Sequence, residues 1–599
     1  MYKNFNKIDG THPWRKVSAE GYLDYPVRYR AGGRVLFFNF PLAKEMGLIS
    51  KNHPTRMNPK LEEAILKTFS IQILNEHDWM TKKRFPLDGY EDRLYMATRY
   101  LQVQHASKQG KTSGDGRSIW NGYIKHRSKT YDISSRGTGN TILSPGAQDV
   151  NKPIATGDES YGYSSGLADL DEMLAGAVMS EIFYRRGVPT ERCLTVIDYK
   201  DKTSIGVRTA PNLIRPAHFF RYLKSAELEE LKKAYDYFIK RQESNNAMNL
   251  PVEGKARYFK SLEYLTETYA KLVALMEEEY IFNWLAWDGD NLLASGAILD
   301  YGSIRQFAAK HNKYRYDDVD RYSTCLTEQR REARYLIQTF VQVVDYITSG
   351  EKKNIKEFEQ SKYCQLFDQH FKEEIQRRML WRMGFNSQQT KILMDNHQQK
   401  VEAFRKALNY FEEIKTSEGE KAVADGIDHP PIFLVRRILR DLPDFLLKHR
   451  QARVWPIMPA EEFCEIMAAS YVDKEDLALT PTREEKAFEF QRLYQDLIYS
   501  VSRKHWVTLK SVAKRAAVTN YANRSTGDGL TWIVMEIINS RERMDRQQIQ
   551  EVLNRFIESQ VLLPGKWRPI TANEMKGPSL KARQLRKMQE TLETYNELI

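Results

Sequence analysis

Apolar and polar positions follow two different patterns along this chain, and the change falls near residue 226. In the first part, apolar residues recur every three or four positions over 58–75 and 168–186, which predicts helices, and Gly187 ends the second one. Polar residues with interspersed Gly and Pro over 139–161 predict a surface loop. Alternating β-branched and aromatic residues predict strands over 34–40, 118–124, 129–135, 192–199 and 204–210.

After residue 226 the pattern is almost entirely helical. Apolar spacing predicts helices throughout residues 458–599, with a break at Pro481 and a charged helix from Leu580 onward. Strands first and helices afterwards predict an α+β fold, with a β-rich lobe followed by a larger helical lobe. Between residue 226 and this region, strong helices are predicted over 227–241, 258–284, 327–348, 399–414 and 432–449.

Composition places the chain among soluble globular proteins, since 41% of its 599 residues are apolar and 28% are charged. No apolar run approaches the length of a membrane span, and no signal peptide is visible, so we expect no membrane segment. The four cysteines are far apart and suit neither a disulfide framework nor a zinc site, which favours the cytoplasm. The net charge of +12 favours anionic ligands, but no nucleic-acid fingerprint accompanies it, so nucleic acid is not the expected partner.

The most informative motif is Asp290-Asn291, followed nine residues later by Asp300-Tyr301-Gly302. An acid beside an amide, then a second acid, is how several phosphoryl-transfer proteins provide a base and hold a metal–nucleotide complex. Mg²⁺ prefers such oxygen ligands and takes the remainder from phosphate and water. The alternative is a solvated turn before a hairpin, because Asp288-Gly289-Asp290-Asn291 has turn chemistry of its own.

A glycine pair before a predicted strand forms a second candidate. Gly114 and Gly116 allow backbone N–H groups to approach a phosphate, and Arg117 can donate two hydrogen bonds to its oxygens. An ordinary tight turn would explain the same residues.

Arginines form a third candidate group. Arg208 ends a predicted strand, and Pro211 turns the chain so that Arg208 and Arg215 can face one cleft. Arg136 lies beside Gly137, which suggests a close approach to a ligand. Guanidinium groups stay charged and match phosphate oxygens, although isolated arginines are more often surface residues.

In this order, the motifs resemble the selenoprotein O family, kinase-like proteins that transfer AMP from ATP to protein hydroxyls. The similarity covers roughly residues 20 to 345. Within this range, 35–48 is similar to the family's N-terminal strand-and-helix segment, and 179–190 is similar to the end of its lobe-bridging helix. Gly114 to Arg117 is similar to the first nucleotide-binding turn of the family, and Gly166 stands in its second. Arg136 takes the place of the family's phosphate lysine, and Gly176 that of its helix glutamate, for which Glu172 one turn earlier is a candidate substitute.

The resemblance implies a protein-kinase-like two-lobed fold with a large, mainly helical C-terminal extension. It assigns Asp290 as the base, Asn291 and Asp300 as ligands of Mg²⁺ or Mn²⁺, and Arg136, Arg208 and Arg215 as phosphate contacts. The expected partners are ATP and proteins with acceptor hydroxyls. The expected regions are an N-terminal extension (1–100), a nucleotide-binding β-rich lobe (101–222), a helical lobe with the metal site (223–455) and a helical C-terminal region (456–599).

Three alternatives to AMP transfer stay open. A protein kinase would transfer the γ-phosphoryl group through the same residues. A pseudoenzyme would act as a scaffold, and Arg136 and Gly176 favour it. A nucleic-acid-binding module is suggested by net charge alone and predicts affinity that falls steeply with salt.

Overall fold

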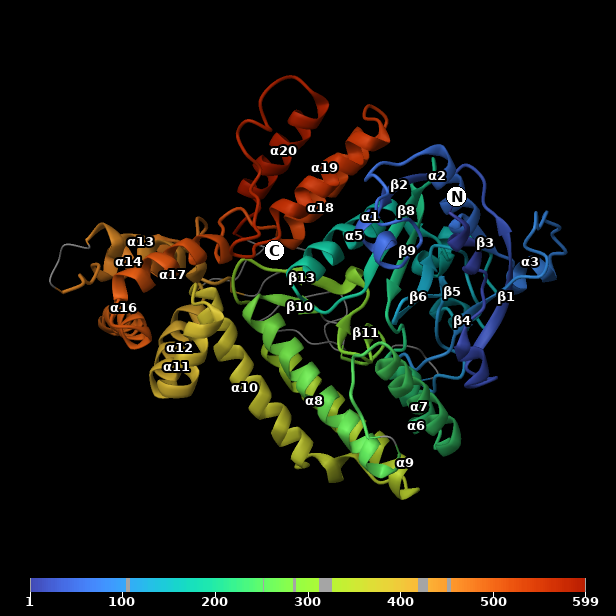
Figure 1. Ribbon diagram of the computed structural model, residues 1–599, viewed down its shortest axis with the longest axis horizontal. Helices are drawn as coiled ribbons and strands as arrows, with labels where there is room; N and C mark the ends of the chain where they lie inside the picture. The colour runs from blue at the N-terminus through green and yellow to red at the C-terminus, as the bar shows by residue number, and fades with distance from the viewer. Residues whose placement is uncertain are drawn as a thin grey trace.

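A large antiparallel sheet organises the first third of the chain in the computed structural model, which describes residues 2–103, 108–251, 253–283, 287–311, 326–417, 429–449 and 454–597. Within these residues the sheet has nine strands in the order β2-β8-β9-β6-β5-β4-β1-β3, and β7 pairs with β9. It fills the right half of Figure 1. The strands are β1 Tyr22–Tyr29, β2 Arg34–Phe38, β3 Ile71–Ile73, β4 Leu94–Thr98, β5 Ser118–His126, β6 Lys129–Arg136, β7 Ala168–Asp169, β8 Arg192–Asp198 and β9 Thr203–Ala210.

Five α-helices alternate with these strands along the described part of the chain. The helix α5 ends at Arg185, and Gly187 follows with a positive φ of 82°, which confirms the stop predicted there. The predicted helix over 58–75 is shorter, because Ile71 and Ile73 pair with β1 instead. The predicted loop over 139–161 is wrong in part: a short helix follows Ser144, and Asn140, Thr141 and Leu143 are buried. These helices are α1 Phe40–Glu45, α2 Pro59–Phe69, α3 Glu76–Met80, α4 Pro145–Asp149 and α5 Leu170–Arg185.

The helical part begins as predicted after the sheet, with two short hairpin-like pairs inserted. The helix predicted over 258–284 ends at Glu278, since Tyr280 adopts a φ of 55° and Ile281–Asn283 form a strand; residue 284 lies outside the described residues. The strand β10 Ile281–Asn283 pairs with β13 Ile304–Gln306, and β11 Leu292–Leu293 pairs with β12 Ala297–Ile298. The helices are α6 Pro216–Lys224, α7 Leu228–Ser244, α8 Lys255–Glu278, α9 Leu326–Ser349, α10 Lys362–Arg382, α11 Ser387–Asn396, α12 Gln398–Glu413, α13 Val435–Lys448, α14 Ala460–Met467, α15 Lys474–Leu477, α16 Pro481–Val501, α17 His505–Thr519, α18 Gly527–Ser540, α19 Arg546–Ser559 and α20 Leu580–Thr594.

The last helices return to the sheet, which the sequence did not predict. The helices α18 and α19 pack against α5, and α19 also contacts the edge strand β2 (Figure 1). Gln550 on α19 accepts a hydrogen bond of 2.8 Å from the backbone N–H of Phe38, so the edge of the sheet is covered. The helices α11 to α17 form a separate apolar core.

The fold thus combines one large sheet with many helices, as predicted for an α+β protein, and the sheet is antiparallel. The boundary that we predicted at residue 100 stays a prediction; the sheet takes β1 and β4 from one side of it and β5 from the other. In the described part of the chain, no helix has the length and apolar character required to cross a bilayer.

Candidate active site

Two neighbouring strands bring the first pair of arginines to one face of the sheet. Arg136 ends β6 opposite Gly206 of β9, and Arg208 follows two residues later on β9. Because alternate residues of a strand share a face, Arg208 lies on the same side as Gly206. Burial and the nearby Arg136 guanidinium lower the pKa of Arg208, which shows that this face concentrates positive charge.

The acid–amide motif lies on the short hairpin of β11 and β12. Leu292 pairs with Ile298, and the N–H of Leu299 donates to the carbonyl of Asn291 at 3.3 Å. This register places Asp290 and Asn291 across from Asp300. Asp300 has a φ of 66°, an uncommon backbone conformation for an L-residue that is often found at functional sites.

A chain of alternating charges connects Asp300 to the sheet. Arg136 forms an ion pair with Asp300 and lies 3.6 Å from a carboxylate oxygen of Glu172. Glu172 on α5 also accepts two hydrogen bonds from Arg117, at 2.6 and 2.9 Å. Burial alone would raise the pKa of Asp300, but Arg136, Arg117 and Arg208 hold it well below its usual range. Asp300 is therefore a carboxylate at neutral pH.

Asp290 has the opposite electrostatic character. Burial first, and then the nearby Asp288 carboxylate, raise the pKa of Asp290 to about 8. Its Oδ1 is buried and accepts no hydrogen bond from the described residues. Arg215 instead donates to the backbone carbonyl of Asp290 at 2.5 Å. A carboxyl group whose pKa lies near neutral pH and whose oxygen is free can both take up and release a proton, as acid–base catalysis requires.

Two acids in the site carried no role in the sequence analysis. Glu191 accepts the backbone N–H of Asp300 at 3.0 Å and lies 3.7 Å from Arg208. Asp115 lies 3.4 Å from Arg215 and is fixed by Thr98 and Trp120. The sequence offered a signal for Asp115, because it stands between the two glycines of the first turn. No sequence motif pointed to Glu191.

Close contacts within the protein already require glycine at the three predicted glycine positions. A Cβ on Gly114 would lie 2.1 Å from the carbonyl oxygen of Thr98, and one on Gly116 would lie 2.8 Å from Cα of Ser144. Gly166 has a φ of 81°, and a Cβ there would lie 2.0 Å from the backbone nitrogen of Asn140. These glycines shape the turns beside Arg117; their role as phosphate contacts stays a prediction.

The donor chemistry of Asn291 and Asp300 suits a hard divalent cation, while the Asp300 carboxylate is paired with Arg136 in this structure. Asn291 offers an amide oxygen and Asp300 an ionised carboxylate, the few protein ligands that Mg²⁺ uses when phosphates and water complete its shell. In the described part of the chain no cluster of three or more His, Cys, Asp or Glu side chains could hold a metal alone. A nearby cavity of about 40 Å³ is lined by Arg136, Glu172, Gly176, Arg208 and Tyr301 among others.

Comparison with known proteins assigns this chain to a family. Residues 48–556 match the family model described as "Protein adenylyltransferase SelO". The match covers most of the chain, so the protein belongs to the SelO family, as the motifs predicted.

Curated relatives agree with this assignment. The protein nucleotidyltransferase YdiU of Clostridium perfringens strain ATCC 13124 is 30% identical over 198 residues, which are 32% of this chain and 36% of the relative. The same-named protein of strain SM101 is 29% identical over 280 residues, 45% and 47% of the two chains. That of Pseudoalteromonas atlantica is 24% identical over 292 residues, 45% and 55%. The matched part thus spans between about a third and about half of these relatives.

Proposed function

We propose that the protein is a metal-dependent adenylyltransferase that moves AMP from ATP to Ser, Thr or Tyr hydroxyls of other proteins. The observation that carries this proposal is the opposition of Asp290 and Asp300 to three buried arginines, Arg136, Arg208 and Arg215. Family membership and the names of the relatives support it. With it we propose a cytoplasmic, kinase-like two-lobed protein with the four regions given above.

In the proposed reaction, the acceptor hydroxyl attacks the α-phosphorus of ATP. The bond between the α-phosphorus and the bridging oxygen breaks, pyrophosphate leaves, and Asp290 takes the hydroxyl proton. Arg208, Arg215 and Arg136 neutralise the charge of the leaving group, since positioning and charge neutralisation dominate such transfers. Mg²⁺ or Mn²⁺ held by Asn291 and Asp300 would supply further charge neutralisation at the phosphates.

Labelled ATP tests this proposal directly. With Mn²⁺ and a protein acceptor, we expect label from [α-³²P]ATP, not from [γ-³²P]ATP, to enter protein. The Asp290→Asn and Asp300→Ala variants should lose incorporation, whereas Asp201→Asn, an exposed acid in the turn after β8, should retain it. Transfer of γ-label would instead establish a protein kinase, and equal α-labelling by Asp300→Ala would remove Asp300 from the mechanism.

A nucleotide-binding pseudoenzyme is the second candidate, and the Arg136–Asp300 ion pair favours it. The guanidinium directly contacts the carboxylate that a metal would need, so this contact must open first. A thermal-shift series with ATP distinguishes the two. A shift with ATP that Mn²⁺ does not increase, together with no label transfer, would support the pseudoenzyme.

A further inference from the structure

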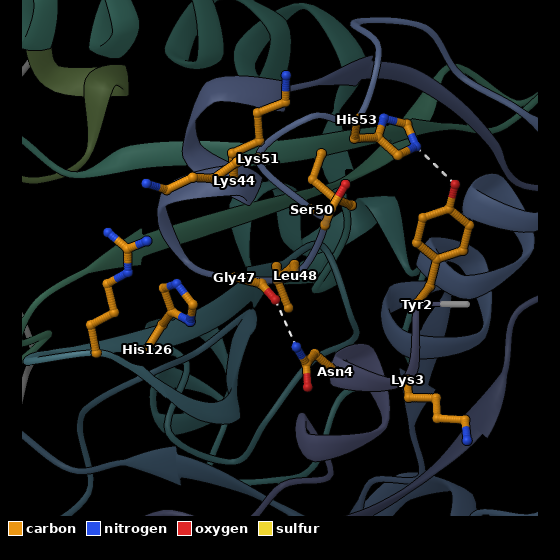
Figure 2. A pocket seen from close by; sticks show the side chains of 12 residues that line it. Tyr2, Lys3, Asn4, Lys44, Gly47, Leu48, Ser50, Lys51, His53 and His126 are labelled. Carbon is orange, nitrogen blue, oxygen red and sulfur yellow. Dashed lines mark hydrogen bonds between the residues drawn. The ribbon is translucent and has the colours of Figure 1, made fainter.

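A second concave site lies far from the candidate active site, at the opposite end of the β5–β6 hairpin. It has a volume of about 510 Å³ and is formed by the segment around Lys3, the residues after α1 and the turn between β5 and β6. Figure 2 shows Lys44 and His126 on one side of it and Tyr2 and His53 on the other. Its basic and imidazole side chains are Lys3, Lys44, Lys51, His53, His126 and Arg127.

The charge of this pocket is one-sided. Among the described residues that line it there is neither an Asp nor a Glu. Lys3, Lys44, Lys51 and Arg127 form no ion pair or side-chain hydrogen bond with the described residues. Glu45, which follows Lys44, is already engaged by Arg192 at 2.8 Å and by the hydroxyl of Tyr131 at 2.7 Å.

The walls of the pocket are fixed by contacts within the protein. The Tyr2 hydroxyl lies 2.8 Å from Nε2 of His53, and Asn4 donates to the carbonyl of Gly47 at 2.7 Å, as drawn in Figure 2. The ring of His126 packs so closely on Gly47 that a Cβ there would lie 2.3 Å from Nδ1. Leu48 is buried beneath, so the basic side chains extend from a rigid base.

We propose that this pocket binds a small phosphorylated anion with at least two phosphate groups. Its volume falls within the roughly 300–1,000 Å³ of small-molecule sites, which favours a compact ligand over a macromolecular surface. Four cations that no protein carboxylate neutralises favour an anionic ligand, and the Arg127 guanidinium can bind two phosphate oxygens at once. The described lining residues include no carboxylate, the group that would favour a metal or a cation.

The pocket is separate from the proposed ATP site. Arg127 lies in the turn that begins β6, and Arg136 is the last residue of that strand of 8 residues. At about 3.3 Å per residue, the two arginines lie on the order of 25–30 Å apart. The two sites therefore have different basic residues and can be varied independently.

Inorganic pyrophosphate in metal-free buffer, followed by calorimetry, is the test. We expect the Lys44→Gln/Arg127→Gln variant to raise the Kd at one site about tenfold or more, because two of the four cations are lost. A Lys60→Gln/Lys67→Gln variant, with two exposed lysines of α2 changed, should bind as the wild type does. Equal pyrophosphate binding by the pocket variant and the wild type would overturn the proposal.

Hydrogen exchange locates the bound anion independently. Pyrophosphate should protect peptides covering residues 40–53 and 123–131, and ADP should do the same if a nucleotide is the source of the phosphates. Protection confined to the strands and hairpin around Arg208 and Asp300 would show that pyrophosphate binds only at the proposed ATP site. At the proposed ATP site the pocket variant should keep its affinity for ATP, since neither Lys44 nor Arg127 lies in that site.

Discussion

Replacement of Arg382 should strongly destabilise the helical part of the protein. Its side chain is 1% exposed at the end of α10, where Nε lies 2.9 Å from Glu278 and Nη2 lies 2.7 Å from Glu412. These two carboxylates belong to α8 and α12, so one guanidinium joins three helices. Arg382→Met keeps much of the side-chain length but removes the charge.

The expected loss of stability follows from the two buried carboxylates that remain after the guanidinium is removed. Among the described residues, Arg405 is then the one cation paired with both carboxylates, at 2.5 Å from Glu278 and 3.9 Å from Glu412, and the Tyr280 hydroxyl still donates to Glu412. Removal of one partner from a buried ion pair costs about 3–5 kcal/mol, because the remaining charge stays desolvated. Since about 1.4 kcal/mol corresponds to a factor of ten, the local opening equilibrium should rise roughly 10²- to 10³-fold or more.

Native-state hydrogen exchange in peptides from α8, α10 and α12 measures this change. Arg377→Met is the matched control, because Arg377 on the same helix is 48% exposed and its pair with Glu374 is worth at most about 1 kcal/mol. Adding Glu412→Gln to Arg382→Met should recover part of the loss. If Arg382→Met costs no more than Arg377→Met, the buried charges do not stabilise these helices.

Three further predictions concern the sheet and the site. Asp300→Asn should abolish the Mn²⁺-dependent part of the thermal shift with ATP while the metal-independent part remains. Gly166→Ala should lower the unfolding temperature more than Gly565→Ala, since both have similar positive φ values but only Gly166 faces a close neighbour, the nitrogen of Asn140. Burial opposes ionisation of Asp132, but its partners Arg241 and His12 lower its pKa. Its stabilising contribution is therefore complete above about pH 4 and declines as the pH falls further, and Asp132→Asn should flatten this part of the unfolding curve.

Local sequence patterns predicted the elements whose signals are themselves local. The strands over 118–136 and 192–210 and the helix before Gly187 agree with the structure, because alternation and a glycine stop act within a few residues. The pairing of β1 with β4 and the return of α19 to β2 depend on contacts far apart in sequence. No periodicity encodes such contacts, so the sequence could not predict them.

The same distinction applies to the site. Asp290, Asn291 and Asp300 are joined by a hairpin, and their spacing together with the order of the other motifs indicated that they belong together. Glu191 lies in the loop before β8, far from Asp300 in sequence. Its role depends on a hydrogen bond from the backbone N–H of Asp300, and no sequence motif indicates such a contact. No local pattern places Arg136 beside Arg208, because their position depends on which strands lie side by side; only the family resemblance implied that they belong together.

The contacts of Glu172 give a physical account of the two departures from the family pattern. Gly176 leaves the expected glutamate position empty, and Glu172 lies one helical turn, about 5.4 Å, away along α5. Arginine has a longer side chain and a wider planar head than lysine, so Arg136 can extend toward Glu172 and Asp300 together. Arg117 fixes Glu172 from the other side with two hydrogen bonds. In this account the arginine at 136 and the glycine at 176 depend on each other. We therefore expect the double variant Arg136→Lys/Gly176→Glu to incorporate more label from [α-³²P]ATP into protein than Arg136→Lys alone.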